Sequence, residues 1–243
     1  MAGKLAPPVA LPRRFYKAVS TAQVAGGTGV FLDGKPIRTP AGRPFTAPAA
    51  ALADMLAAEW DAQATHIDMT SMPAVRLAFT AIDFVPNSRD GVAAEIGRYA
   101  GSDALCYFAE GPQALVEAQA RRWGPVLDWA AEALHLHFVR VTGVAHKDQP
   151  ADTLLRIARL AEKEDDFALA GIAHATALFG SGILAFSLHR GQLDAEAVFD
   201  LSRLDEAFQQ ERWGVDEEAA ERTANMRAEA HMLDRWFRAL ERG

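Results

Sequence analysis

The chain changes its hydrophobic period once, close to Pro48, and this change constrains the fold more than any other feature of the sequence. Before Pro48, short apolar runs are separated by Gly- and Pro-containing turns, a pattern typical of β-strands. After Pro48, apolar residues recur every three or four positions almost to the end of the chain, as in amphipathic helices. We therefore expect an α+β fold, with a small N-terminal antiparallel sheet and two helices, followed by a larger multi-helical, orthogonal bundle-like domain.

The strongest local signal in the first part is Asp33-Gly34, which lies between two apolar runs. Both central positions of a two-residue hairpin turn need positive φ, and Asp-Gly is a preferred pair for that geometry. The expected extended pieces are 15–24, 29–32, 35–39 and 45–46.

The same hairpin has the spacing of a nucleotide-binding loop, because four residues separate Gly29 from Gly34 and Lys35 follows. Such a loop needs flexible residues between the glycines, a Ser or Thr after the lysine, and a helix start to stabilise the phosphates. Here the intervening residues favour a strand and Pro36 replaces the hydroxyl. We favour the hairpin, and keep a small nucleotide-dependent enzyme that uses the Gly29 to Lys35 hairpin as the alternative function.

Two helices, at 50–63 and 74–85, follow the predicted sheet. Pro86-Asn87-Ser88 then interrupts the pattern, and Asn and Ser are good N-caps for a helix that follows. We expect a domain boundary here, with a mixed α/β domain at 1–88 and a helical domain at 89–243.

The rest of the chain is predicted to be mostly helical, with two short strands at 105–109 and 138–142 that pair. The charge run at 162–166 is typical of a solvated turn in which Asp165 or Asp166 caps the next helix. The apolar stretch 168–188 predicts a buried helix or helix pair. The expected helices are 113–134, 151–161, 165–179, 181–188, 194–213 and 217–240.

The bulk composition excludes several classes of function. A formal net charge of -7 and a pI near 5.5 do not suit binding to nucleic acid or to anionic membranes. The single cysteine, Cys106, rules out an internal disulfide framework, fits a reducing compartment, and has apolar neighbours typical of the core. No run reaches the roughly twenty apolar residues of a membrane span, and residues 1–12 lack a hydrophobic secretory core. We expect a cytoplasmic protein that does not insert into membranes.

The residues that could carry catalysis form no convincing site. His135 and His137 have no third ligand at metal spacing, and no zinc-type motif occurs. His174 lies in the most apolar helix, where a hydrogen-bonded core residue is expected rather than a base. Ser181 lacks the Gly-x-Ser-x-Gly pattern of a nucleophile elbow. We expect no enzyme activity, no metal and no cofactor.

One acidic residue stands out in the predicted helix 194–213. Val198, Leu201, Leu204 and Phe208 share one face of this helix, and Asp205 falls inside their apolar arc. A carboxylate there is costly unless it is paired, caps a helix or is offered to a partner. The helix is expected to stop at Gly214. A core helix with one satisfied acid explains the same pattern.

Several segments, in this order, match one family. They are Arg14-Phe15-Tyr16-Lys17, Leu32-Asp33-Gly34-Lys35-Pro36 with Thr39-Pro40, Glu59-Trp60-Asp61-Ala62-Gln63, Met72 to Asp83, Tyr99, Asp103, Leu105-Cys106-Tyr107, Gln119, Trp123, Pro125, Leu127-Asp128-Trp129, and Leu204, Asp205, Glu206, Gln209, Trp213 and Gly214. From Arg14 to about Glu217, the chain resembles the Atp-twelve family, the assembly chaperones of the F-type ATP synthase head. Phe79 and the tail after Glu217 depart from the family pattern.

The resemblance implies a non-catalytic chaperone that binds the unassembled alpha subunit and shields its interface until the beta subunit replaces it. It implies Glu206, Asp205, Gln209, Trp213 and Glu217 as partner contacts, with Glu206 almost opposite the apolar face of the helix. The alternative is that Asp205 and Trp213 only hold the helical domain together. We expect a monomer when free, in the bacterial cytoplasm, or in the mitochondrial matrix if the source is eukaryotic.

Overall fold

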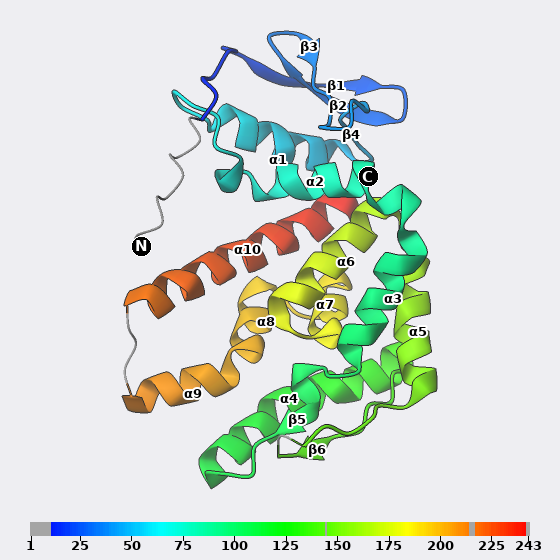
Figure 1. Cartoon of the computed structure of the whole chain (residues 1–243), viewed down its shortest axis with the longest axis vertical. Helices are drawn as coiled ribbons and strands as arrows, with labels where there is room; N and C mark the ends of the chain where they lie inside the picture. Colours follow the sequence, from blue (N-terminus) through cyan, green and yellow to red (C-terminus); the bar gives the residue numbers. More distant parts are fainter. Residues whose placement is uncertain (1–10, 144, 214–216, 242–243) are drawn as a thin grey trace, which may run out of the picture.

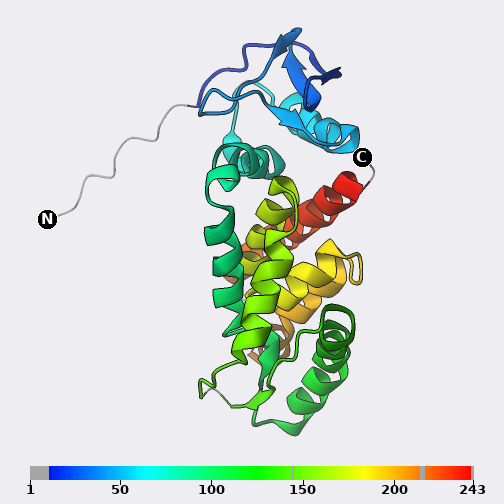
Figure 2. The same ribbon diagram turned by 90° about the vertical axis from the view of Figure 1, so that its right-hand side faces the viewer.

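A computed structural model describes residues 11–143, 145–213 and 217–241 of the chain. A small sheet lies at one end of the long axis, two helices lie beneath it, and the other helices fill the rest of the molecule (Figure 1). The view turned by 90° shows the same succession from sheet to helices (Figure 2). The predicted α+β class, a small antiparallel sheet with two helices followed by a larger helical region, is confirmed.

The sheet is antiparallel, and β2 is central because it pairs with each of the other strands. The predicted hairpin is confirmed, since Asp33 and Gly34 have φ angles of 48° and 75°. Gly27, at φ 138°, lies so close to β4 that an added Cβ would be 2.2 Å from the Ala47 carbonyl oxygen. The strands are β1 Val19–Val24, β2 Gly27–Leu32, β3 Lys35–Pro36 and β4 Thr46–Ala47.

Two predicted strands are too long. The strand expected at 15–24 begins only at Val19, because the amides of Lys17 and Ala18 donate to the Asp33 side chain instead of to a strand. The strand expected at 35–39 ends at Pro36. Beyond it, Thr39 bonds to the backbone of Arg43 within a turn.

Two helices, α1 Ala50–Asp61 and α2 Pro73–Asp83, cover the sheet on one side (Figure 1). Both are shorter than predicted. After α1, the side chain of Gln63 bonds to the Glu59 carbonyl and to the amide of Asp68, which fixes a turn there. After α2, Pro86 lies in a short 3-10 helix, Val85–Asn87.

The remaining elements form the helical region. Ser88 occupies the N-cap position of α3, but its side chain makes no capping bond, so that part of the capping prediction is wrong. The predicted pairing of two short strands is confirmed, and these strands are parallel. The elements are α3 Arg89–Ala100, 3-10 helix Ala104–Cys106, β5 Tyr107–Phe108, α4 Gln113–Leu134, β6 Val141–Thr142, α5 Ala151–Glu162, α6 Asp166–Phe179, α7 Gly182–His189, α8 Ala195–Ser202, α9 Leu204–Trp213 and α10 Glu217–Glu241.

The single helix predicted at 194–213 is wrong, because the chain breaks into α8 and α9 at Arg203. In a continuous helix the Leu201 carbonyl would accept the amide of Asp205. Here it accepts the indole N–H of Trp123 at 3.1 Å. The Ser202 hydroxyl also donates to the Phe199 carbonyl at 2.8 Å. A long-range contact therefore ends the helix where the local apolar spacing continues.

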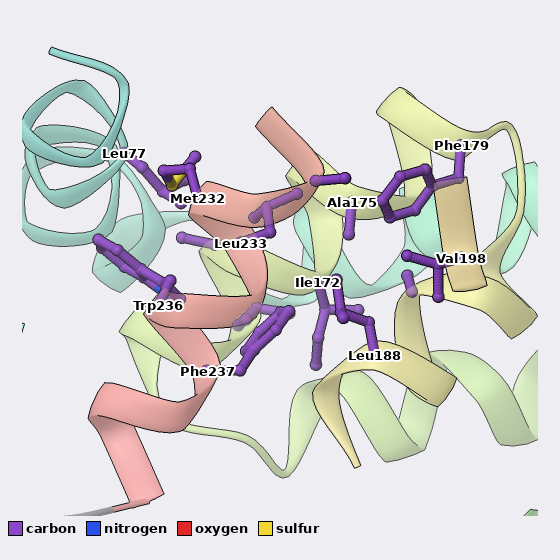
Figure 3. Close-up of a cluster of buried hydrophobic side chains, with 14 of the residues drawn as sticks. Leu77, Ile172, Ala175, Phe179, Leu188, Val198, Met232, Leu233, Trp236 and Phe237 are labelled. Carbon is purple, nitrogen blue, oxygen red and sulfur yellow. The ribbon is translucent and has the colours of Figure 1, made fainter. Parts of the chain in front are cut away.

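The core runs without interruption from the sheet to the helical region, and α10 forms the link. Trp236, Phe237 and Leu233 of α10 are buried between Leu77 of α2 and Ile172 of α6 (Figure 3). The predicted buried helix pair is α6 with α7, and Cys106 is fully buried as expected. Among the described residues, no helix is both long and apolar enough to cross a membrane.

Candidate partner-binding surface

Several residues that carry the family resemblance hold distant segments together near the sheet. The Arg14 guanidinium donates to the carbonyls of Asp61 at 2.9 Å and of Gln63. The Tyr16 hydroxyl donates to the Trp60 carbonyl at 2.6 Å. The Glu59 carboxylate accepts two amides at the start of α2, at 3.0 and 2.8 Å. Burial raises the pKa of Glu59, while these two amides act in the opposite direction. These residues fasten the N-terminal segment and α2 to the end of α1.

A second polar contact lies in the centre of the helical region. The fully buried Asp103 accepts the amides of Leu105 and Ile183, both at 3.1 Å, and thereby ties the segment after α3 to the start of α7. Burial raises the pKa of the Asp103 carboxyl to about 6, against the lowering effect of these bonds and of the Ser181 hydroxyl. Sequence reasoning assigned no role to Asp103, because its partner Ile183 lies 80 positions away.

The acidic residue in the apolar arc, Asp205, makes the corresponding contact between α9 and α4. Its Oδ1 accepts the side-chain amide of Gln119 at 2.7 Å. Gln119 is fully buried and accepts the amide of Ala109 at 2.8 Å with its own carbonyl oxygen. Burial raises the pKa of Asp205, and the Gln119 bond partly opposes this shift. The acid is therefore half-buried and partnered within the chain.

The other face of α9 is open to solvent. The Glu206 side chain is 47% exposed and lies 3.3 Å from the guanidinium of Arg203. Gln209 is exposed and its side chain makes no hydrogen bond among the described residues. Trp213 ends α9 and Glu217 begins α10, but the side chains of both lie outside the described part of the chain, as does the predicted stop at Gly214. The structure thus separates Asp205, which faces α4, from the exposed Glu206 and Gln209.

A broad groove of about 1200 Å³ lies between α2, α6 and α10. Its walls combine apolar side chains such as Leu77, Phe84 and Met232 with charges of both signs. His174 lies there, 2.9 Å from Glu229, and this bond lowers the pKa of the Glu229 carboxyl. His174 is hydrogen-bonded as predicted, but it is 39% exposed and not a core residue, since the groove opens beside it.

The glycine–lysine hairpin does not have the geometry of a phosphate-binding loop. The backbone between Gly29 and Leu32 is part of strand β2, and Lys35 with Pro36 forms β3, so the turn contains only two residues. No helix begins directly after Lys35, since β4 comes next and α1 starts only at Ala50, so the hairpin has no adjoining helix N-terminus to stabilise an anion. Ser181 caps α7 through the amide of Leu184, and Asp165 caps α6. Within the described residues, no group of three His, Cys, Asp or Glu side chains could hold a metal ion.

Comparison with known proteins decides the family. The model of the family described as ATP12 chaperone protein matches residues 13–131. The crystal structure of Atp12 from Paracoccus denitrificans superposes with a TM-score of 0.87 at 40% identity, covering 94% of this chain and 98% of that one. The chain belongs to the ATP12 chaperone family.

Two further relatives extend the likeness. The crystal structure of a protein from Agrobacterium tumefaciens, described as a chaperone, has a TM-score of 0.88 and 44% identity, covering 95% of this chain and 87% of that one. The mitochondrial protein atp12 of Schizosaccharomyces pombe is 27% identical over 222 residues, which are 86% of this chain and 76% of that protein. The predicted family and fold are therefore confirmed, and the family is described as one of chaperones.

Proposed function

We propose that this chain is a non-catalytic chaperone that binds the unassembled alpha subunit of the ATP synthase head and covers its interface until the beta subunit replaces it. An isolated subunit exposes an apolar interface that aggregates unless it is covered. Membership of the ATP12 family supports an assembly role, and the resemblance of the sequence supports alpha as the client.

The observation that carries the proposal is the two-sided character of α9. Its inner side is fixed to α4 by the Asp205–Gln119 bond and the buried Leu204. Its outer side presents Glu206 and Gln209 on a helix whose position is fixed. Contact residues on a positioned helix bind with a smaller loss of conformational entropy than residues on a mobile segment. We assign Glu206, Gln209, Trp213 and Glu217 to the contact with the client. Asp205 contributes to the same surface, because its bond to Gln119 holds α9 in place.

The bacterial sources of the two structural relatives support the cytoplasm as the compartment, and a eukaryotic source would place the chain in the mitochondrial matrix. We further propose that the free chaperone is a monomer. We also propose that the sheet with α1 and α2, up to Ser88, and the helices that follow are two domains that pack closely on one continuous core. A placeholder must bind less tightly than the final partner, whose obligate interface is larger.

Size-exclusion co-elution tests the proposal. The chain is mixed with alpha or beta subunits produced separately from the same source. Light scattering then measures the molar masses of the complexes. We expect a one-to-one complex with alpha, none with beta, and release of the chaperone when beta is added to the alpha complex. Failure to co-elute with alpha, while folded alpha still assembles with beta, contradicts the proposal.

A further inference from the structure

The electric charge of the chain is divided unevenly between the sheet and the helices. Residues 11–49 carry six Lys or Arg residues and a single acid, Asp33, whereas residues 50–243 carry 18 basic and 31 acidic residues. The segment that contains the sheet, at one end of the molecule (Figure 1), is thus basic, although the chain has a net charge of -7. An uneven charge distribution of this kind attracts partners of opposite sign to one face.

Only some of these cations are available to a partner. The Arg14 guanidinium is bound to backbone carbonyls at the end of α1, and Arg43 donates to the Ile82 carbonyl at 2.7 Å. The exposed Lys35 of β3 makes no side-chain hydrogen bond or ion pair among the described residues. Arg38 is also exposed and uses one nitrogen, Nη1, to donate to the Gly42 carbonyl at 2.8 Å. Lys35 and Arg38 therefore remain the accessible positive charges of the hairpin.

These two cations border a hollow of about 480 Å³, here called the β3 pocket, between the β2–β3 hairpin, the N-terminal segment and α1. Phe15, Leu32 and Ile37 supply its apolar lining. Phe15 is 75% exposed, the highest value among the large hydrophobic side chains of the described residues. An exposed aromatic ring beside a hollow is typical of a surface that receives another chain.

Trp60 adds a second irregularity to the β3 pocket. Its side chain lines the pocket and is only 7% exposed, yet its indole N–H has no acceptor among the described residues. A buried donor without an acceptor costs free energy, so the fold leaves one polar group of this wall unsatisfied. The one acid in the lining, Asp33, accepts the amides of Lys17 and Ala18 at 2.9–3.2 Å and stays charged, so the two cations Lys35 and Arg38 face one anion.

We propose that the β3 pocket binds an extended acidic segment of the client, with carboxylates facing Lys35 and Arg38 and an apolar side chain packed on Phe15. The proposal builds on the proposed function by naming the chemistry of a second client contact, far from α9 along the long axis (Figure 1). The apolar lining favours a protein segment over a free anion, because a small anion leaves Phe15 uncovered. The free cations favour an acidic segment over a neutral one.

The test uses a fluorescein-labelled ten-residue peptide of alternating Glu and Phe, and its analogue with Gln in place of every Glu. Fluorescence anisotropy measures their affinity for the full chain at 50 and 300 mM NaCl. We expect the Glu peptide to bind at least tenfold tighter than the Gln peptide at low salt, with most of this difference lost at high salt. Equal affinities for the two peptides overturn the proposal.

The decisive variants are Lys35→Glu and the double variant Lys35→Glu/Arg38→Glu. The matched control is Arg159→Glu/Lys163→Glu, at the end of α5 and directly after it, which makes the same change in net charge on exposed residues elsewhere. We expect at least tenfold weaker binding of the Glu peptide to the hairpin double variant, an intermediate loss for Lys35→Glu, and less than a twofold change for the control. Circular dichroism and thermal melting establish that each variant is folded. Equal losses of affinity in both double variants contradict a binding site at the β2–β3 hairpin.

The same variants separate this proposal from the proposed function. If the wild-type chain captures the alpha subunit and the hairpin double variant captures it equally well at low salt, the β3 pocket proposal fails and the chaperone function stands. If the Glu peptide binds at the hairpin but the alpha subunit does not co-elute with the wild-type chain, the proposed client is wrong and the acidic-segment site stands.

Discussion

The centre of the helical region and the α9 edge use the same kind of polar contact at different depths. In the centre, the fully buried Asp103 joins the end of α3 to α7, 80 positions away. At the edge, the half-buried Asp205 joins α9 to Gln119 of α4, 86 positions away. Both acids hold a helix in place, but water reaches only the second. The degree of burial therefore distinguishes the two contacts. The Asp103 contact belongs to the core, whereas the Asp205 contact can break without unfolding the rest of the chain.

The largest effect is expected for Asp103→Ala. The substitution leaves the buried amides of Leu105 and Ile183 and the Ser181 hydroxyl without their acceptor. Leaving several buried donors unsatisfied should lower the free energy of unfolding by about 3 kcal/mol. Urea unfolding at pH 7, followed by circular dichroism, measures this change. A loss below that of Asp205→Ala would show that depth does not rank the two contacts.

The pH dependence of stability tests whether the Asp103 carboxyl is buried as a charged group. The pKa of Asp103 is about 6 in the fold against 3.8 in the unfolded chain, so the folded state takes up the proton first as the pH falls. Protonation of Asp103 then relieves the cost of burying its charge, and stability rises as the pH falls through 6. Between pH 8 and pH 5, the wild type should gain about 1.4 kcal/mol relative to the non-titrating Asp103→Asn variant.

Urea titrations of both proteins at several pH values measure this difference. The pair formed by Glu229 and His174 acts in the opposite direction, since a lowered carboxyl pKa gives stability that is lost as the pH falls. Because both proteins contain this pair, its effect cancels in the difference. A difference that stays flat, or has the opposite sign, would show that Asp103 is not the buried charge described here.

Asp205→Ala should have a smaller and more local effect. The buried side-chain amide of Gln119 loses its acceptor, but water can reach the half-buried site, so the expected loss is about 1 kcal/mol. Hydrogen exchange should accelerate in α9 and remain unchanged in α6. Asp205→Asn keeps an acceptor oxygen at this position and serves as the control. Faster exchange in both helices would mean that α9 belongs to the cooperative core.

This contrast also explains how much of the molecule could be predicted from its sequence. The hairpin followed from Asp33-Gly34, and the buried α6–α7 pair followed from the apolar run, because both depend on neighbouring residues. The break at Arg203 could not be predicted, since it depends on the Trp123 indole binding a carbonyl 78 positions away. The pattern identified Asp205 as unusual, but only the structure pairs it with Gln119. Local signals therefore predicted the elements, and long-range polar contacts decided how they join.

The smallest effect on stability, and the largest expected on client binding, belongs to Glu206→Lys. Glu206 is half-exposed and, among the described residues, forms an ion pair with Arg203 alone, so its replacement should change the free energy of unfolding by about 0.5 kcal/mol. Its matched control is Glu95→Lys on α3, because Glu95 is also exposed and paired with an arginine three positions away, Arg98. We expect Glu206→Lys to weaken binding of the alpha subunit about tenfold, whereas Glu95→Lys leaves it within twofold, as measured by biolayer interferometry.

If the two variants bind equally well, the exposed side of α9 does not contact the client. If Glu206→Lys unfolds the chain, Glu206 is a structural contact like Asp103. In that case the exposed side of α9 is needed for folding, and exposure does not separate binding residues from structural ones there.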